Sequence, residues 1–207
     1  MNYKALNPST ENLFESTLKK IQHQLETKRK DTTTGLKLLA RFDELKKYRS
    51  LYVHKVIEVR GKNGAFLIAL IDKHLTIIET KRHSRTEKEI EEVEPVLVFS
   101  VPQDMGKVYI RKETLVDKVL DLFTKVDIGF NEYPNFSKNY YVVGENPDQV
   151  KKHLPKGLMK SLDNIKNLTV EITGNWGLLR TERNLTEYVL LFLVSIGNKM
   201  TALDTAN

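Results

Sequence analysis

The sequence predicts an α+β fold, in which an antiparallel β-sheet is combined with an N-terminal amphipathic helix and a C-terminal portion of helix, hairpin and helix. Apolar residues recur at helical spacing near both ends, whereas residues 51–101 carry short β-branched and apolar runs separated by turn residues. These segments are grouped rather than strictly alternating, which favours α+β over a parallel α/β sheet. With 40% hydrophobic and 29% charged residues, the 207-residue chain has the composition of a folded globular protein.

The first predicted element is an amphipathic helix that begins near Pro8. Its apolar positions are Leu13, Phe14, Leu18, Ile21 and Leu25. Polar Lys, Gln and Glu residues stand between them, as expected for a helix with one buried face. We expect this helix to end before residues 31–35, a run of turn-forming residues, and to dock either on its own chain or on a partner. Residues 36–49 suit a helix or a short strand.

Strands are predicted from Leu51 onwards. The runs are LYVHKVIEV, AFLIALI, HLTIIET and, further along, VLVFSV. Asn63 followed by Gly64 predicts a tight hairpin turn between the first two runs, because both residue types accept positive φ angles. Residues 81–94, KRHSRTEKEIEEVE, are so highly charged that they predict a mobile loop or a solvated hairpin tip.

The second half of the chain mixes helices and strands. The predicted elements are a strand over 106–111, a helix over 114–123, a loop at 133–136, a strand over 139–143, a helix from Pro155, and a hairpin formed by 168–173 and 176–180. Asn146 followed by Pro147 predicts a further helix start, because Asn caps helices and Pro fits their first turn. A last helix follows Asn184, and its apolar residues nearly surround it, which predicts burial.

These elements divide the chain into three parts. They are an N-terminal helix and linker over 1–35, a β-rich half over 36–130, and an α+β half over 131–207. The length fits one domain or two small ones, so the two halves either fold separately or form one compact domain.

The block Tyr133–Gly144, YPNFSKNYYVVG, resembles an uncharacterised family of bacterial proteins in which a block of this kind joins a β-rich half to an α+β half. The resemblance extends over roughly residues 50 to 200, and its distinctive residues are Pro134, Phe136, Ser137, Tyr140 and Gly144. It implies the architecture and no catalytic residues. Many family members carry hydrophobic N-terminal segments that suggest membrane attachment, a feature from which this chain departs.

The sequence shows no catalytic motif and predicts neither a cofactor nor a metal site. The absence of cysteine excludes disulfides, thiolate zinc sites and a cysteine nucleophile. No phosphate loop, dinucleotide fingerprint or metalloprotease motif occurs. His54 and His74 could approach each other on neighbouring strands, but ordinary polar strand positions explain them better. The sequence therefore favours a protein that is not an enzyme.

Two sets of residues are candidates for binding. A ligand or partner surface is predicted from Tyr133, Phe136, Ser137, Tyr140, Trp176 and Arg180. An anion-binding surface is predicted from Lys28, Arg29, Lys30, Lys46 and Lys47. These residues belong to the stretch Lys19–Arg49, which holds most of the formal net charge of +6.

Three functions remain open on these grounds. The preferred one is a non-catalytic interaction or accessory domain that binds an unknown protein partner, or a second copy of itself, through the N-terminal helix. The alternatives are binding of nucleic acid or anionic lipid through Lys19–Arg49, and a divergent enzyme built from residues such as Asp72, His74, Tyr140 and Arg180. The lack of an apolar leader or membrane-spanning run predicts a cytoplasmic location, with the inner face of the membrane as an alternative.

Overall fold

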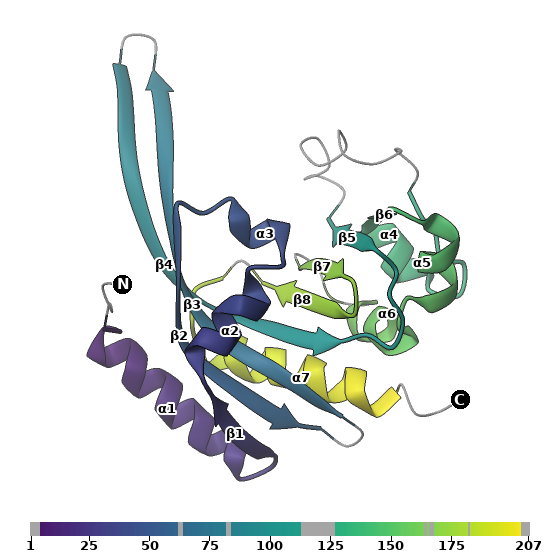
Figure 1. Ribbon diagram of the computed structural model, residues 1–207, viewed down its shortest axis with the longest axis horizontal. Helices are drawn as coiled ribbons and strands as arrows, with labels where there is room; N and C mark the ends of the chain where they lie inside the picture. Colours follow the sequence, from purple (N-terminus) through teal and green to yellow (C-terminus); the bar gives the residue numbers. More distant parts are fainter. Residues whose placement is uncertain are drawn as a thin grey trace.

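An eight-stranded antiparallel sheet forms the centre of the molecule, with strand order β1-β2-β3-β4-β8-β7-β5-β6 (Figure 1). The computed structural model describes residues 5–61, 64–81, 84–112, 127–163, 165, 168–181 and 183–203, and within these the side chains outside 75–81, 84–90 and 201–203. The strands are β1 (Glu26–Lys30), β2 (Ser50–Arg60), β3 (Ala65–Lys81), β4 (Ser84–Ser100), β5 (Lys107–Arg111), β6 (Tyr141–Gly144), β7 (Thr169–Thr173) and β8 (Trp176–Arg180). The helices are α1 (Pro8–Gln22), α2 (Thr32–Leu39), α3 (Asp43–Lys46), α4 (Pro134–Asn139), α5 (Pro147–His153), α6 (Lys156–Leu162) and α7 (Glu187–Leu203). The predicted α+β fold class is confirmed.

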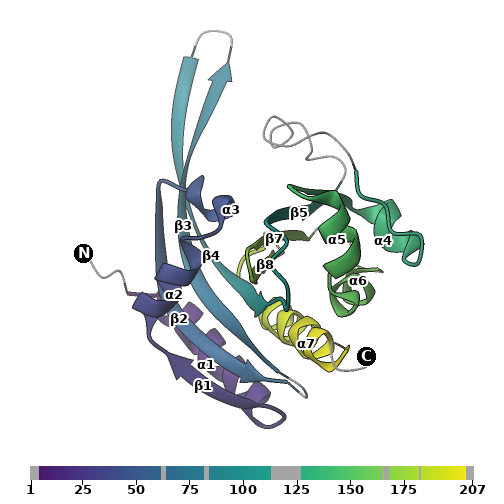
Figure 2. The same cartoon turned by 45° about the vertical axis from the view of Figure 1, so that its right-hand side comes forward.

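Helices cover both faces of the sheet (Figures 1 and 2). Successive strand residues point to opposite faces, so neighbouring apolar residues enter different cores. Val56 and Val98 pack with Leu39 of α2, whereas Ile57 and Leu97 belong to the larger core shared with α1 and α7. This alternation explains why two helix layers can form on one sheet.

The N-terminal helix is confirmed and packs on its own chain. The Asn7 side chain caps it by accepting a hydrogen bond from the Ser9 N–H at 2.9 Å. Phe14, Leu18 and Ile21 are all buried in the larger core. A partner would therefore have to bind the exposed polar side of α1.

The segment after α1 differs from the prediction in two places. Residues 26–30 form strand β1, paired antiparallel with β2, instead of a helix end or loop. The turn-forming run 31–35 begins helix α2, because the Asp31 carboxylate accepts a hydrogen bond from the Thr34 N–H at 2.9 Å and so caps the helix. Residues 36–49 contain helix rather than strand.

The β3–β4 hairpin is longer than predicted. The two expected strands over 65–71 and 74–80 are one strand, and the charged segment 81–94 mostly belongs to β4 rather than to a loop. The ladder runs from Leu67 opposite Val98 to Lys81 opposite Ser84. The high charge of this segment was a poor indicator of a loop, because backbone hydrogen bonds form an antiparallel ladder whatever the charge of the side chains. Beyond His74 the hairpin leaves β2 and projects from the body (Figures 1 and 2).

Most other elements match their predictions. The strand at 106–111, the strand at 139–143, the Asn146 cap, the helix from Pro155, the final hairpin and the last helix are confirmed within a few residues. The predicted loop at 133–136 is wrong, because Pro134 occupies the first turn of helix α4. The expected helix over 114–123 lies outside the described residues, as does Asn63 of the predicted turn.

One sheet connects the two halves of the chain. Strands β7 and β8 lie between β4 and β5 in the strand order. The contact between β4 and β8 extends from Leu97 opposite Leu179 to Ser100 opposite Trp176. This short junction joins the long hairpin to the α+β half.

Candidate ligand-binding groove

A groove of about 440 Å³ lies beside α2 and over the neighbouring strands. We call it the α2 groove. Its apolar lining is formed by Leu38, Val56, Ala65, Phe66, Leu67, Val98 and Trp176. Its polar lining is formed by Lys30, Thr34, Lys37, Arg41, Glu58 and Ser100, and Gly35 completes it. The volume falls within the range of roughly 300–1,000 Å³ that is common for small-molecule sites.

The strand register assembles this lining. Leu67 of β3 lies opposite both Glu58 of β2 and Val98 of β4, and Ser100 lies opposite Trp176 of β8. Residues directly opposite in an antiparallel ladder share a face of the sheet, so all of these side chains point to the α2 side.

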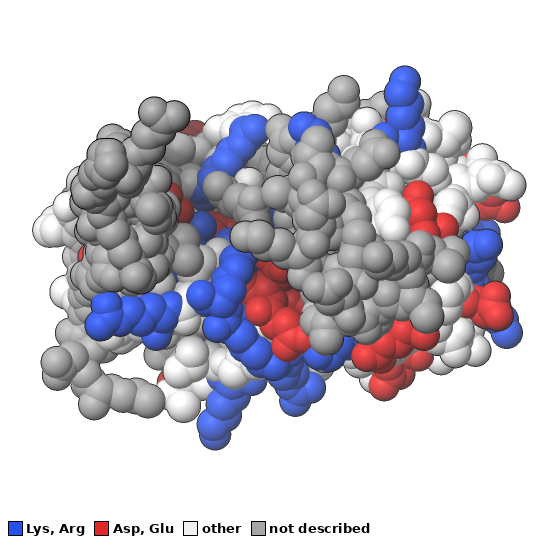
Figure 3. Space-filling view, turned by 90° about the horizontal axis from the view of Figure 1, so that it is seen from above, with Lys and Arg blue, Asp and Glu red and all other residues white. Residues whose placement is uncertain are grey.

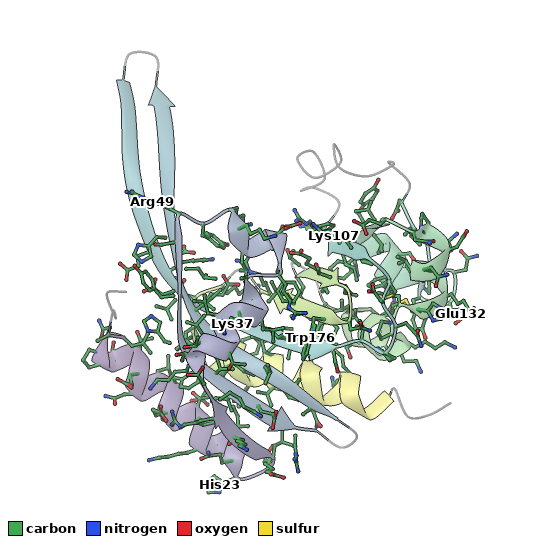
Figure 4. All side chains as sticks on the ribbon, in the orientation of Figure 1. His23, Lys37, Arg49, Lys107, Glu132 and Trp176 are labelled. Atoms are coloured by element: carbon green, nitrogen blue, oxygen red, sulfur yellow. The ribbon has the colours of Figure 1, made fainter. Side chains whose placement is uncertain are left out.

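Helix α2 covers only part of this surface. A Cβ added to Gly35 would lie 2.4 Å from Cγ2 of Val56, which shows how closely the helix approaches β2 at this residue. Helix α2 has only eight residues, and Leu38, Leu67 and Trp176 stay partly exposed beside it. Figure 4 shows Lys37 on α2 and Trp176 on β8 at this side of the sheet.

The rim of the groove is positively charged. Lys30 forms an ion pair with Glu58 at 2.7 Å, and this hydrogen-bonded lysine is the main cause that lowers the pKa of Glu58. Lys37 and Arg41 are exposed and form no ion pair with any described residue. The groove therefore combines an apolar floor with two cations that are available to an anion.

A buried network of charges lies on the same face of the sheet, beneath α3. Arg180, with no solvent exposure, donates from Nε to Glu94 at 3.0 Å, and from Nη2 to Glu94 at 2.8 Å and to the Tyr48 hydroxyl at 2.6 Å. Lys73 donates to the same Glu94 carboxylate at 2.7 Å, and the Arg180 Nη1 atom lies 3.5 Å from Glu44. Each charge in this cluster thus has an opposite charge beside it.

These contacts keep the network ionised. Burial alone would raise the pKa of Glu94, but the hydrogen bonds and charges of Arg180 and Lys73 outweigh it and lower that pKa. Burial would likewise lower the pKa of Lys73, yet the neighbouring Glu94 raises it. None of these residues lines the α2 groove, so the network is best explained as the anchor of α3 on the sheet.

A second buried carboxylate caps α3. Glu171 of β7 accepts hydrogen bonds from the N–H groups of Asp43 and Glu44, both at 2.8 Å. Burial raises the pKa of Glu171, and the hydrogen bonds from the Asp43 N–H and the Thr173 hydroxyl partly offset that rise. Asp43 pairs with Lys107 and Lys46, which lower its pKa to about 2. Figure 3 shows such neighbouring cations and anions side by side on the surface seen from the hairpin end.

The predicted ligand surface is divided between different parts of the molecule. Phe136 and Tyr140 are buried in the larger core, and the Tyr140 hydroxyl donates to the Ile165 carbonyl at 2.9 Å. The Ser137 hydroxyl accepts a hydrogen bond from the Phe130 N–H and donates one to the Phe130 carbonyl. Tyr133 packs against the same core. In that set, only Trp176 lines the α2 groove.

The predicted anion-binding residues are also dispersed. Arg29 pairs with Glu15, Lys46 with Asp43 and Lys47 with Glu44. Lys30 lies at the rim of the groove in its pair with Glu58, and Lys28 is exposed on β1.

The predicted anion-binding set did not include Lys37 and Arg41, the two rim cations. Lys37 and Arg41 lie inside the basic segment Lys19–Arg49 but were not selected from it, because they are not adjacent in sequence. Their spacing of four residues, which places side chains on one side of a helix, was the available signal.

Comparison with known proteins identifies a similar fold. The architecture is shared with the crystal structure of the mycobacterial trehalose monomycolate transport factor A, TtfA, at a TM-score of 0.53. The two sequences are 14% identical, and the alignment covers 95% of each chain, so the likeness concerns the fold alone. The chain matches no protein-family model and no curated protein. Its resemblance to an uncharacterised bacterial family stays a prediction. Within the described part of the chain, every helix falls short of what a bilayer-spanning segment requires.

Proposed function

We propose that this chain is a non-catalytic accessory domain that binds one anionic amphiphile in the α2 groove. The ligand class is a molecule with a single apolar chain and an anionic head group, such as a long-chain carboxylate. The observation that carries the proposal is the apolar floor beneath two exposed cations without ion-pair partners among the described residues.

The floor favours an apolar chain. Leu38, Leu67 and Trp176 are partly exposed and line the groove, and burial of such apolar surface stabilises a complex by about 25 cal/mol per Å² before the costs of association. Trp176 is half-buried, so a ligand would cover its remaining exposed surface.

The rim favours an anion. Lys37 and Arg41 can contact a head group without first breaking an internal ion pair, whereas Lys30 is already paired with Glu58. These three cations belong to the basic segment Lys19–Arg49. The proposal therefore places anionic-lipid binding, which was predicted for the whole segment, in the α2 groove and at Lys37 and Arg41. The described neighbour, TtfA, is named as a transport factor, which is compatible with an accessory role. A cytoplasmic location stays part of the proposal.

Fluorescence of the single tryptophan provides the test. Monomeric dodecanoate is titrated into the full chain, and its binding is expected to change Trp176 emission saturably. The double variant Lys37→Gln/Arg41→Gln is expected to raise the dissociation constant about five- to thirtyfold, since two partly exposed charge contacts contribute about 0.5–1 kcal/mol each.

A matched control is the double variant Lys151→Gln/Lys160→Gln, which removes two exposed lysines from α5 and α6 and should leave affinity unchanged. Dodecyltrimethylammonium, with the same chain and the opposite charge, should bind more weakly. Equal binding of the two amphiphiles, or equal binding by the rim variant and the parent chain, contradicts the proposal. So does binding confined to DNA or to anionic vesicles.

A further inference from the structure

The base of the β3–β4 hairpin brings together a set of side chains that the sequence analysis considered separately. The donor atoms of Asp72, His74 and Glu91 all lie within 4.8 Å of one another. Asp72 and His74 are two residues apart on β3, and Glu91 of β4 lies directly opposite His74. All three therefore share one face of the ladder. This is the face that carries Leu70, opposite to the one that carries the α2 groove.

Strand β2 adds a fourth residue. A register shift between Val53 and Lys55 places His54 at a bulge, where its Nε2 atom lies 3.5 Å from Oδ2 of Asp72. The other carboxylate oxygen of Asp72, Oδ1, lies 3.5 Å from Nε2 of His74. Both Asp72 and His54 are buried, whereas Glu91 is exposed. The cluster is thus fixed on its inner side and open to solvent at Glu91.

We propose that Asp72, His74 and Glu91 bind one divalent transition-metal ion, with Zn²⁺ as the first ion to test, and that His54 positions Asp72. The donor set contains imidazole nitrogen and carboxylate oxygen without sulfur, which suits Zn²⁺, Co²⁺ or Mn²⁺. Three protein ligands leave a coordination position for water. His54 would orient the Asp72 carboxylate, as residues that hydrogen-bond to a metal ligand commonly do.

The distances support an ion rather than an internal hydrogen bond. His54 and His74 each lie 3.5 Å from Asp72, but only the His54 contact has the geometry of a hydrogen bond. The Nε2 atom of His74 is buried and forms no hydrogen bond with the described part of the chain. Two ligands that each lie about 2.0–2.2 Å from a tetrahedral ion are roughly 3.4 Å apart. The observed spacing therefore fits two atoms that share an ion between them.

The place of the site suggests its role. Pairing of β2 with β3 ends at Ser50 opposite His74, and beyond this point the hairpin continues as two strands only. An ion held by β3 and β4, with β2 supporting Asp72, would brace the hairpin where it leaves the sheet. This role does not depend on the proposed ligand of the α2 groove.

The test measures metal binding to the full chain. Chelator-treated protein is titrated with Zn²⁺ by calorimetry, and binding of one ion per chain is expected. Glu91→Gln and His74→Gln should each raise the dissociation constant for Zn²⁺ at least tenfold. Because Glu91 is exposed, its variant should fold even if the His74 variant does not. Bound Co²⁺ should give visible absorption that shows nitrogen and oxygen ligation in the parent chain and changes in Glu91→Gln.

Glu92→Gln is the matched control, because Glu92 is the next residue of β4 and contacts Lys73 on the other face at 3.0 Å. It should bind Zn²⁺ within about twofold of the parent. Failure of the parent chain to bind one Zn²⁺ at submillimolar concentration overturns the site. Glu91→Gln and Glu92→Gln with the same affinity as the parent would overturn it equally.

Discussion

The guanidinium of Arg180 is fully buried, and the Glu94 carboxylate compensates its charge. Removing one member of a buried pair leaves the other charge uncompensated, which costs more than the pair itself contributes. Glu94→Gln keeps the shape of the side chain and removes its charge from between Arg180 and Lys73. We expect the free energy of unfolding, measured by urea denaturation, to fall by about 3–5 kcal/mol.

Glu26→Gln serves as the control at this scale, since the Glu26 pair with Arg60 is long, at 3.5 Å, and exposed on both sides. It should change the denaturation midpoint little. A Glu94→Gln variant as stable as this control would mean that water or a shifted protonation state already compensates Arg180.

At the scale of elements, the junction of β4 and β8 depends on a glycine. A Cβ added to Gly177 would lie 2.2–2.6 Å from ring carbons of Phe99, its opposite residue across the ladder. Phe99 is buried, so its ring cannot move into solvent. We expect Gly177→Ala to lower the free energy of unfolding by about 1–3 kcal/mol through overpacking. Trp176 fluorescence during urea denaturation measures it.

The double variant Gly177→Ala/Phe99→Leu separates this contact from other effects. Leu is smaller than the ring and leaves space for the new methyl group, so the double variant should lose less stability than the sum of the two single changes. Additive losses would show that Gly177 is needed for another reason.

Elements with local signals could be predicted from the sequence, and elements formed by pairing could not. Helix α1 and the Asn146 cap were found because spacing and capping are local. Strand β1, ETKRK, has no apolar residue, and only its pairing with β2 makes it a strand. The Pro134 turn was interpreted as a loop because Pro suits both a loop and a first helical turn.

The candidate site follows the same distinction. Trp176, the only tryptophan of the sequence, was among the predicted ligand residues, but its grouping with Leu67 and Val98 depends on the register of separate strands. The approach of His54 to Asp72 depends on a bulge in β2 that no local residue pattern indicates. Arg180 was expected near a ligand, whereas pairing with Glu94 uses it inside the fold.

The whole molecule contrasts a broad covered sheet with a projecting two-stranded hairpin (Figure 2). Between Leu67 and Ile71, β3 is paired on both sides, with β2 and with β4. Beyond His74, β3 pairs with β4 alone. Two-stranded ladders are marginally stable by themselves, whereas strands inside a wide sheet open only with much of the fold.

Native-state hydrogen exchange of the metal-free chain tests this contrast. We expect backbone amides of Leu75–Lys81 to exchange at least tenfold faster than those of Leu67–Ile71, because their ladder can open without disturbing β2 or either helix layer. The comparison is made within one strand and one protein sample, so pH and temperature affect both segments alike. Equal protection of the two segments would mean that the hairpin is held by contacts beyond its own ladder, as it would be if it formed an interface between copies of the chain.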